Sequence, residues 1–71
     1  MKIIREWLKE IRLAKGLSQM AVAQEATGIS QQLYGMIETG ERRPSVKNAK
    51  KIAAVLGFDW QLFYPDEEST A

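Results

Sequence analysis

The chain is short, and its composition narrows what it can do. It has 71 residues, 45% of them hydrophobic, and a formal net charge of +1, which fits one small globular domain. It contains no cysteine and no histidine, so it lacks the usual zinc ligands, any thiolate chemistry and the commonest general base. We therefore expect no metal, no cofactor and no enzymatic activity.

The charges are unevenly distributed along the chain. Residues 1–51 hold all ten Lys and Arg and five Glu, a net charge of +5, whereas residues 52–71 hold four acidic residues and no basic one. A basic body with an acidic tail fits a partner such as nucleic acid, although a solvated surface of mixed charge would look similar. Residues 1–16 are too charged for a signal peptide and no apolar run approaches the ~20 residues of a membrane span, so we expect a cytoplasmic protein.

The first predicted element is an amphipathic helix over about residues 3–15. Gly16 follows Lys15 and fits the left-handed end of such a helix. The apolar stripe repeats at the spacing of helical turns and consists of Ile4, Trp7, Leu8 and Ile11.

Two short helices are predicted in the middle of the chain. Ser18 is placed to cap a helix over about residues 19–26, and Ser30 is placed to cap another over about 31–39. The dipeptide Thr27-Gly28 provides the turn between them, because glycine tolerates left-handed backbone.

The last third of the chain predicts one longer helix and one short one. Ser45 caps a helix over about 46–56 that Gly57 ends, and Asp59 caps a short helix over 60–63. No segment alternates with the period of a strand. We therefore expect an all-α bundle, with one domain over 1–64 and a short acidic tail over 65–71.

The two central helices carry the chemistry that suggests function. Two helices joined by a short glycine-containing turn form a helix-turn-helix unit, whose second helix enters the major groove of DNA. The second helix opens with Gln31 and Gln32, and a glutamine amide matches the N6 donor and N7 acceptor of adenine.

The segments GLSQMAVAQEATGIS, MIETGERRPSV and AKKIAAVLGF resemble the Cro/CI/Xre helix-turn-helix family, which includes the lambdoid phage repressors. The resemblance runs from about residue 7 to 63. It implies a compact five-helix bundle of the lambda-repressor type, with a recognition helix over about 31–38. It also implies a homodimeric transcription regulator of the repressor, mobile-element or controller type, which binds an inverted repeat in double-stranded DNA without a small-molecule ligand. Such a protein would lie on the nucleoid when bound.

The resemblance assigns roles position by position. It implies base reading at the recognition helix and at the start of the preceding one, by Gln31, Gln32, Met36 and Gln19. It implies phosphate contacts from Ser18, Ser30, Thr39, Arg42 and Arg43. It also implies that Arg12 and Glu38 form an internal ion pair, and that Ala23 lets the two helices cross closely. Tyr34 is expected to face the core and Leu33 to lie at the DNA edge. The stretch between Gln19 and Gly40 is one residue longer than the commonest family pattern, which we place at the turn.

Each of these assignments has a simpler alternative. Exposed glutamines are usually only solvated, Met36 could pack in the core, and loop arginines such as Arg42 and Arg43 often only increase solubility. At the level of function, the alternative is a protein-interaction module, such as an antitoxin or adaptor that kept this fold.

A dimer contact would have to come from the helical domain itself. Large apolar side chains cluster near the C-terminal end, and we expect them to form this surface, although all of them could instead close the core. They are Phe58, Trp60, Leu62, Phe63 and Tyr64.

Overall fold

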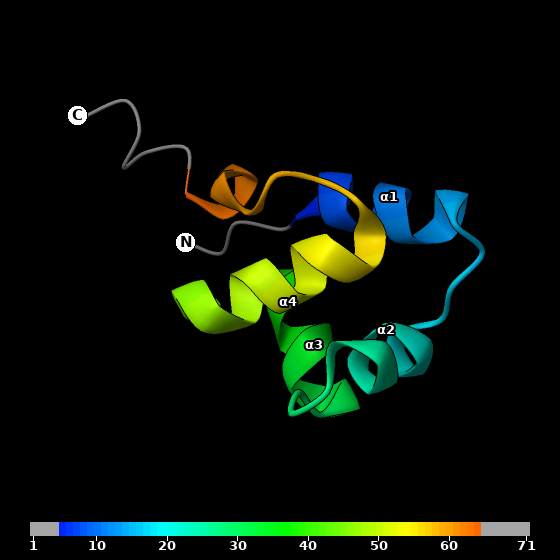
Figure 1. Cartoon of the computed structure of the whole chain (residues 1–71), viewed down its shortest axis with the longest axis horizontal. Helices are drawn as coiled ribbons and strands as arrows, with labels where there is room; N and C mark the ends of the chain where they lie inside the picture. Colours follow the sequence, from blue (N-terminus) through cyan, green and yellow to red (C-terminus); the bar gives the residue numbers. More distant parts are fainter. Residues whose placement is uncertain (1–4, 65–71) are drawn as a thin grey trace.

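The computed structural model describes residues 5–64, which form four α-helices and a final 3₁₀ turn. The helices are α1 (Glu6–Ala14), α2 (Gln19–Ala26), α3 (Gln31–Thr39) and α4 (Val46–Leu56), and the turn is η1 (Trp60–Phe63) (Figure 1). No strand occurs within residues 5–64, so the all-α class is confirmed. The expected fifth helix is instead a 3₁₀ turn. Only four residues separate Asp59 from Tyr64, which is enough for a 3₁₀ turn and too few for a stable α-helix.

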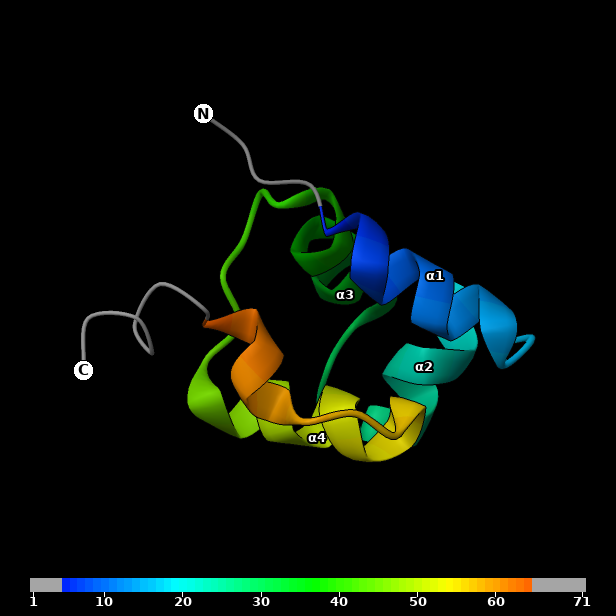
Figure 2. The ribbon, with the colours of Figure 1, turned by 90° about the horizontal axis from the view of Figure 1, so that it is seen from above.

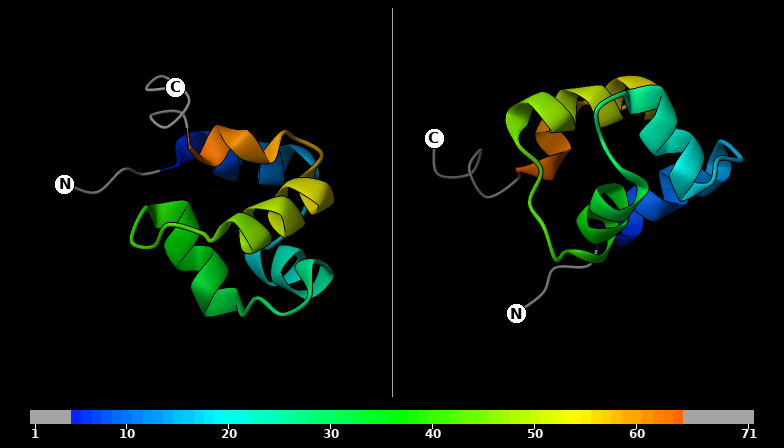
Figure 3. Two further views of the ribbon diagram at one scale, coloured as in Figure 1. Left: turned by 60° about the vertical axis from the view of Figure 1, so that its left-hand side comes forward. Right: turned by 90° about the horizontal axis from the view of Figure 1, so that it is seen from below.

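The elements form two layers, one on each side of α4. Helix α1 and η1 lie on one side of α4, whereas α2 and α3 lie on the other (Figures 1 and 3). Contacts run between α2 and α3, from α4 to α2 and η1, and between α1 and α3. The α2–α3 pair thereby forms one face of the molecule, supported from behind by α1 and α4.

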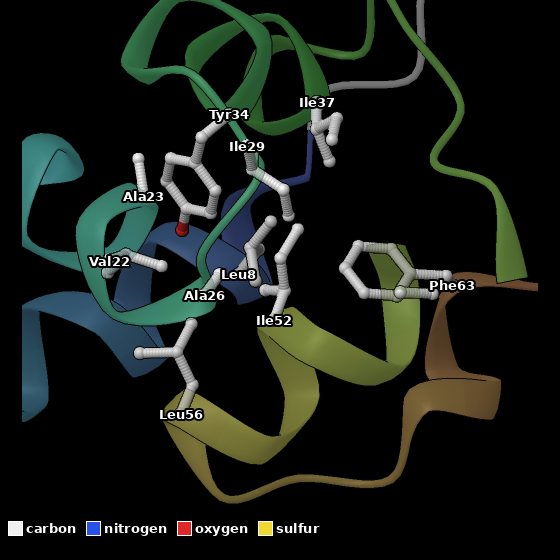
Figure 4. Close-up of a cluster of buried hydrophobic side chains, with 11 residues drawn as sticks. Leu8, Val22, Ala23, Ala26, Ile29, Tyr34, Ile37, Ile52, Leu56 and Phe63 are labelled. Carbon is white, nitrogen blue, oxygen red and sulfur yellow. The ribbon is translucent and has the colours of Figure 1, made fainter. Parts of the chain in front are cut away.

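The core lies where all four helices meet (Figure 4). Its fully buried large side chains come from every α-helix, so each helix is anchored by at least one apolar residue. These side chains are Leu8, Val22, Tyr34, Ile37, Ile52 and Leu56. Tyr34 lies inside as expected from the resemblance, and Ala23, at 4% exposure, lies in the same cluster.

The residues predicted to cap the helices do so. The hydroxyls of Ser18, Ser30 and Ser45 accept hydrogen bonds from the backbone N–H three residues on, at 3.0, 3.0 and 3.2 Å. Asp59 accepts one from the Gln61 N–H at 3.0 Å. Gly40, at the end of α3, is left-handed with φ 86°, as the C-terminal position of a helix often requires. These contacts fix where the short helices begin and end.

The turn between α2 and α3 combines two left-handed residues. Thr27 has φ 49° and Gly28 has φ 81°, and the Lys51 ammonium donates a hydrogen bond to the Thr27 carbonyl at 3.0 Å. This turn is where we place the extra residue relative to the family pattern. A lysine from α4 therefore secures the connection that sets α3 against α2.

Two expectations extend beyond the described part of the chain. Helix α1 begins at Glu6, and Arg5 lies at its non-helical N-cap position, so the first helix starts later than the predicted residue 3. Residues 3 and 4 and the acidic tail over 65–71 lie outside residues 5–64. Within the described residues, no helix is both long and apolar enough to cross a bilayer.

Candidate nucleic-acid interface

The first turn of α3 presents amide side chains to solvent. Gln31 and Gln32 are both exposed, whereas Tyr34 and Ile37 are fully buried. Met36 lies four residues after Gln32, on the same side of the helix, and is half-buried. Leu33 is also half-buried and packs against the edge of the core. The α3 helix thus has one buried face and one polar face that begins at its capped N-terminus.

The first residue of α2 is held by α3. The Gln19 amide nitrogen donates a hydrogen bond to Oε1 of Glu38 at 3.0 Å, and the Gln19 side chain is half-buried. This glutamine, which the resemblance assigns to base reading, therefore differs from Gln31 and Gln32 in having an internal partner.

Arg12 and Glu38 meet as a two-pronged ion pair between α1 and α3. Arg12 Nε lies 2.7 Å from Glu38 Oε2, and Arg12 Nη2 donates to Oε1 at 3.2 Å. Arg12 Nη1 also donates to the Leu17 carbonyl at 2.9 Å. Both residues are buried, at 7% and 5% exposure. The pair ties the end of α3 to α1 and to the segment that leads into α2.

The surroundings of this pair favour its charged form. Burial acts to raise the pKa of Glu38, but the hydrogen bonds to its carboxylate and the positive charge of Arg12 together outweigh burial and lower that pKa below its ordinary value. The hydrogen bond to Glu38 likewise raises the pKa of Arg12, against the opposing effect of burial. The carboxylate is therefore ionised at neutral pH and can accept hydrogen bonds from both α1 and α2.

The loop after α3 carries the two arginines assigned to phosphate. Arg42 and Arg43 are both exposed, and the Met36 carbonyl accepts hydrogen bonds from the N–H groups of Glu41 and Arg42 at 2.9 and 3.2 Å. The Arg43 guanidinium stacks over the Tyr64 ring at 4.9 Å. Backbone contacts thus hold the loop against α3, where both cations are accessible.

The remaining residues assigned to phosphate are exposed at the ends of α2 and α3. Ser18 and Ser30 are exposed at the N-termini of α2 and α3, where the helix dipole favours an anion. Thr39 is exposed at the end of α3, and its hydroxyl donates to the Met36 carbonyl at 3.2 Å.

Two residues that help to position α3 were not predicted from the sequence. Arg5 precedes α1, and its guanidinium donates to the Ile37 carbonyl at 2.7 Å and to the Arg42 carbonyl at 3.3 Å. It thereby joins α1 to the end of α3 and to the arginine loop. Lys51 performs the corresponding role at the other end of α3, through the Thr27 carbonyl. Neither has a local signal in the sequence, because both act on backbone carbonyls more than 20 residues away.

The C-terminal aromatic cluster is more buried than expected. Phe63 is a core residue at 4% exposure, and the Trp7 ring contacts those of Phe58 and Phe63, with centroids 5.3 Å apart in each case. The assignment of Phe63 to a dimer surface is therefore corrected, because Trp7 supplies an aromatic partner from α1.

The other C-terminal side chains have different neighbours. Leu62 is 50% exposed and lines an apolar pocket beside Trp7 and Ile11. Trp60 and Tyr64 are half-buried, and the Tyr64 hydroxyl donates to the Pro44 carbonyl. This contact joins the end of η1 to the segment that enters α4 (Figure 2).

The fold and this face together define a helix-turn-helix domain: two short capped helices meet at a tight turn, and the second exposes its amides. A family model described as helix-turn-helix matches residues 8–63. The chain is 50% identical over 64 residues to the uncharacterized HTH-type transcriptional regulator YqaF of Bacillus subtilis, an overlap of 90% of this chain and 83% of that protein. The chain belongs to the Cro/CI-type helix-turn-helix family, HTH_3.

Two further relatives are longer than this chain. The SPbeta prophage-derived uncharacterized HTH-type transcriptional regulator YonR of Bacillus subtilis is 40% identical over 52 residues, which cover 73% of this chain and 47% of YonR. The crystal structure of an HTH_3 family transcriptional regulator from Vibrio cholerae aligns with a TM-score of 0.69 and 36% identity, over 94% of this chain and 37% of that one. This chain therefore corresponds to less than half of either protein.

Proposed function

We propose that this chain binds double-stranded DNA sequence-specifically and regulates transcription, with α3 as the recognition helix. The observation that carries the proposal is the exposed pair Gln31 and Gln32 at the capped N-terminus of α3. The names of YqaF and YonR, both HTH-type transcriptional regulators, support the same function.

We assign base reading to the polar face of α3. In the major groove a glutamine amide can donate to N7 and accept from N6 of the same adenine, which no other base pair reproduces. Gln32 lies opposite the buried face and Gln31 beside it, so we assign adenine recognition to this pair. Met36, one turn further on, supplies an apolar contact of the kind that suits a thymine methyl group.

Phosphate contacts then surround the reading helix. The N-termini of α2 and α3, with Ser18 and Ser30, supply backbone N–H groups and hydroxyls on one side. Thr39, Arg42 and Arg43 supply a hydroxyl and two cations on the other. These contacts set the position of α3 in the groove and provide most of the non-specific affinity.

We further propose that two copies bind one operator as a repressor. The proposed contact lies where η1 meets the start of α4, around Trp60 and Tyr64, with Val46 nearby at 48% exposure. Two-fold symmetry would then match an inverted repeat.

Selection of binding sites from random duplex DNA tests the proposal. We expect enrichment of one sequence with an adenine among the bases that face α3, repeated in inverted orientation. If no sequence is enriched, while the domain captures a protein partner through α3, the fold serves as an interaction module instead.

A further inference from the structure

The acidic end of the sequence has no role in the proposed function. Asp66, Glu67 and Glu68 follow the last described residue, Tyr64, and no basic residue occurs after Lys51. Three neighbouring carboxylates repel one another, and cations within reach would relieve that repulsion. What this segment can do therefore depends on the charges around Tyr64.

Tyr64 ends the described chain beside the arginine loop. Its hydroxyl donates a hydrogen bond to the Pro44 carbonyl, and the Arg43 guanidinium lies over its ring at 4.9 Å. The end of η1 is thus attached to the segment that connects α3 to α4, as the orange and green ribbons of Figure 2 show. The acidic segment therefore begins next to the arginines that the proposed function assigns to phosphate.

The charges of this loop are mainly positive. Arg42 and Arg43 are both exposed, and Arg5 reaches the loop by donating to the Arg42 carbonyl. Burial is the main cause that lowers the pKa of Arg5, and the positive charge of Arg43 lowers that pKa further. These two cations are therefore close enough to repel each other. Glu41 is the only acidic residue in the sequence of the loop, so the cations outnumber it.

The covalent chain keeps the carboxylates close to these arginines. An extended chain spans at most about 3.3–3.6 Å per residue, so the Cα atom of Asp66 lies within about 7 Å of that of Tyr64, and that of Glu68 within about 14 Å. Charges at such separations still interact at physiological ionic strength, where the screening length is about 8 Å. A short link also gives a tethered group an effective concentration on the order of millimolar. The segment therefore meets the loop without having to be captured from solution.

We propose that residues 66–68 occupy the surface formed by Arg42 and Arg43 in the free protein and compete there with the phosphates of DNA. Carboxylate and phosphate oxygens both match the planar fork of a guanidinium, so the segment acts as an internal substitute for the DNA backbone. The inference rests on the proposed function. It adds that the chain weakens its own binding to every DNA sequence by the same factor, so that stable binding also requires the base contacts of α3.

Neutralising the segment tests this competition. Glu67→Gln with Glu68→Gln removes two negative charges from it. Glu10→Gln with Glu25→Gln removes the same charge from two exposed positions on α1 and α2 and is the matched control. Fluorescence anisotropy on random duplexes that hold a single copy measures the affinities. We expect the first variant to bind about threefold or more tightly at low salt, with a salt dependence steeper by about one unit, and the control to change much less.

The gain in affinity should depend on the arginines. In a protein that carries Arg42→Ala and Arg43→Ala, the substitutions at Glu67 and Glu68 should change the affinity no more than the control pair does, because the cations that the segment covers are gone. An equal gain with and without the arginines would overturn the inference. A gain no larger than that of the control would overturn it as well, since only net charge would then matter.

A second measurement needs no DNA. Because the chain contains no cysteine, Ser69→Cys provides a single site for a nitroxide spin label beside the carboxylates. The label should broaden the amide NMR signals of residues 41–43 more strongly at low salt than at roughly 1 M salt, where the screening length is about 3 Å. The signals of Thr27 and Gly28, at the other end of α3, should not respond to salt in this way.

The two measurements separate failure of the inference from failure of the proposed function. Broadening of residues 41–43 that does not change with salt would overturn the contact between the segment and the arginines. If the broadening depends on salt as expected but no variant binds DNA, the proposed function fails, and the competitive role fails with it although the contact exists.

Discussion

At the scale of single residues, the domain depends on one buried ion pair. Arg12 and Glu38 are shielded from water and meet through two hydrogen bonds, so neither charge is left without compensation. A buried pair is not necessarily stabilising relative to an apolar pair, but losing one partner leaves a stranded charge. The pair therefore serves mainly to fix the end of α3 against α1.

A double-mutant cycle measures this coupling. Arg12→Met or Glu38→Leu alone should each reduce the free energy of unfolding by about 3–5 kcal/mol. The double variant should lose much less than the sum, because no unpaired charge remains. Chemical denaturation provides the free energies, and additive losses would show that the two residues stabilise the fold independently.

The lowered pKa of Glu38 predicts a pH dependence. A carboxylate whose pKa is lower in the folded state adds stability above its unfolded pKa, taken as 4.5, and that stability is lost as the pH falls through the folded pKa. The unfolding free energy should therefore decrease from pH 5 downward more steeply in the wild type than in Glu38→Gln, which lacks this group. Parallel pH curves for the two proteins would contradict the assignment.

At the scale of elements, the proposed function assigns base reading to the start of α3 and arginine–phosphate contacts to the loop that follows it. Gln31 and Gln32 stand at the N-terminus of α3, whereas Arg42 and Arg43 stand beyond its C-terminus, and Arg5 joins that loop to α1. In the proposed function, the arginines would therefore hold the DNA backbone at the end of α3 opposite its base-reading amides, and Ser30 would hold it at the N-terminal end.

The loop arginines should act on all DNA sequences alike. Replacing Arg42 with Ala should weaken binding to the operator and to random DNA by the same factor, and should reduce the slope of log affinity against log salt by about one unit. Arg43→Ala should do the same, and Lys47→Ala on the exposed side of α4 is a comparison outside this loop. Fluorescence anisotropy at several salt concentrations measures the slopes. An unchanged slope would mean that the arginines serve only solubility.

Most of the element boundaries could be predicted because their signals are local. Ser18, Ser30, Ser45 and the glycines that end α3 and α4 act within one turn of their own position. The positions of Arg5 and Lys51 as links between elements could not be predicted, since each depends on a backbone carbonyl brought close only by tertiary packing. The same holds for Phe63, which is buried because Trp7 reaches it from α1.

At the scale of the whole molecule, the proposed dimer on an inverted repeat depends on the size of the domain. The domain measures 34 × 24 × 23 Å, and adjacent half-sites on one face of DNA lie about 34 Å apart. If the long axis of the domain lay along the DNA, a copy of this length would reach a second copy on the neighbouring half-site.

Sedimentation with an operator duplex tests this assembly. On a duplex that holds both half-sites, we expect two copies per DNA at saturation, because each recognition helix reads only one half. Trp60→Ala should shift the second binding event to higher protein concentration and leave the first unchanged. Leu62→Ala, in the pocket beside α1, is the control outside the proposed contact. A complex that saturates at one copy would show that the domain acts as a monomer.

The central claim is that α3 reads bases through its first-turn amides, and one comparison tests it most directly. The affinity of wild-type protein and of Gln32→Ala is measured on the best selected site and on random duplex of equal length at one salt concentration. Losing a bidentate amide contact should cost about 1–3 kcal/mol on the selected site and almost nothing on random DNA, since phosphate contacts carry the non-specific affinity. Equal losses on both duplexes would contradict base reading by α3.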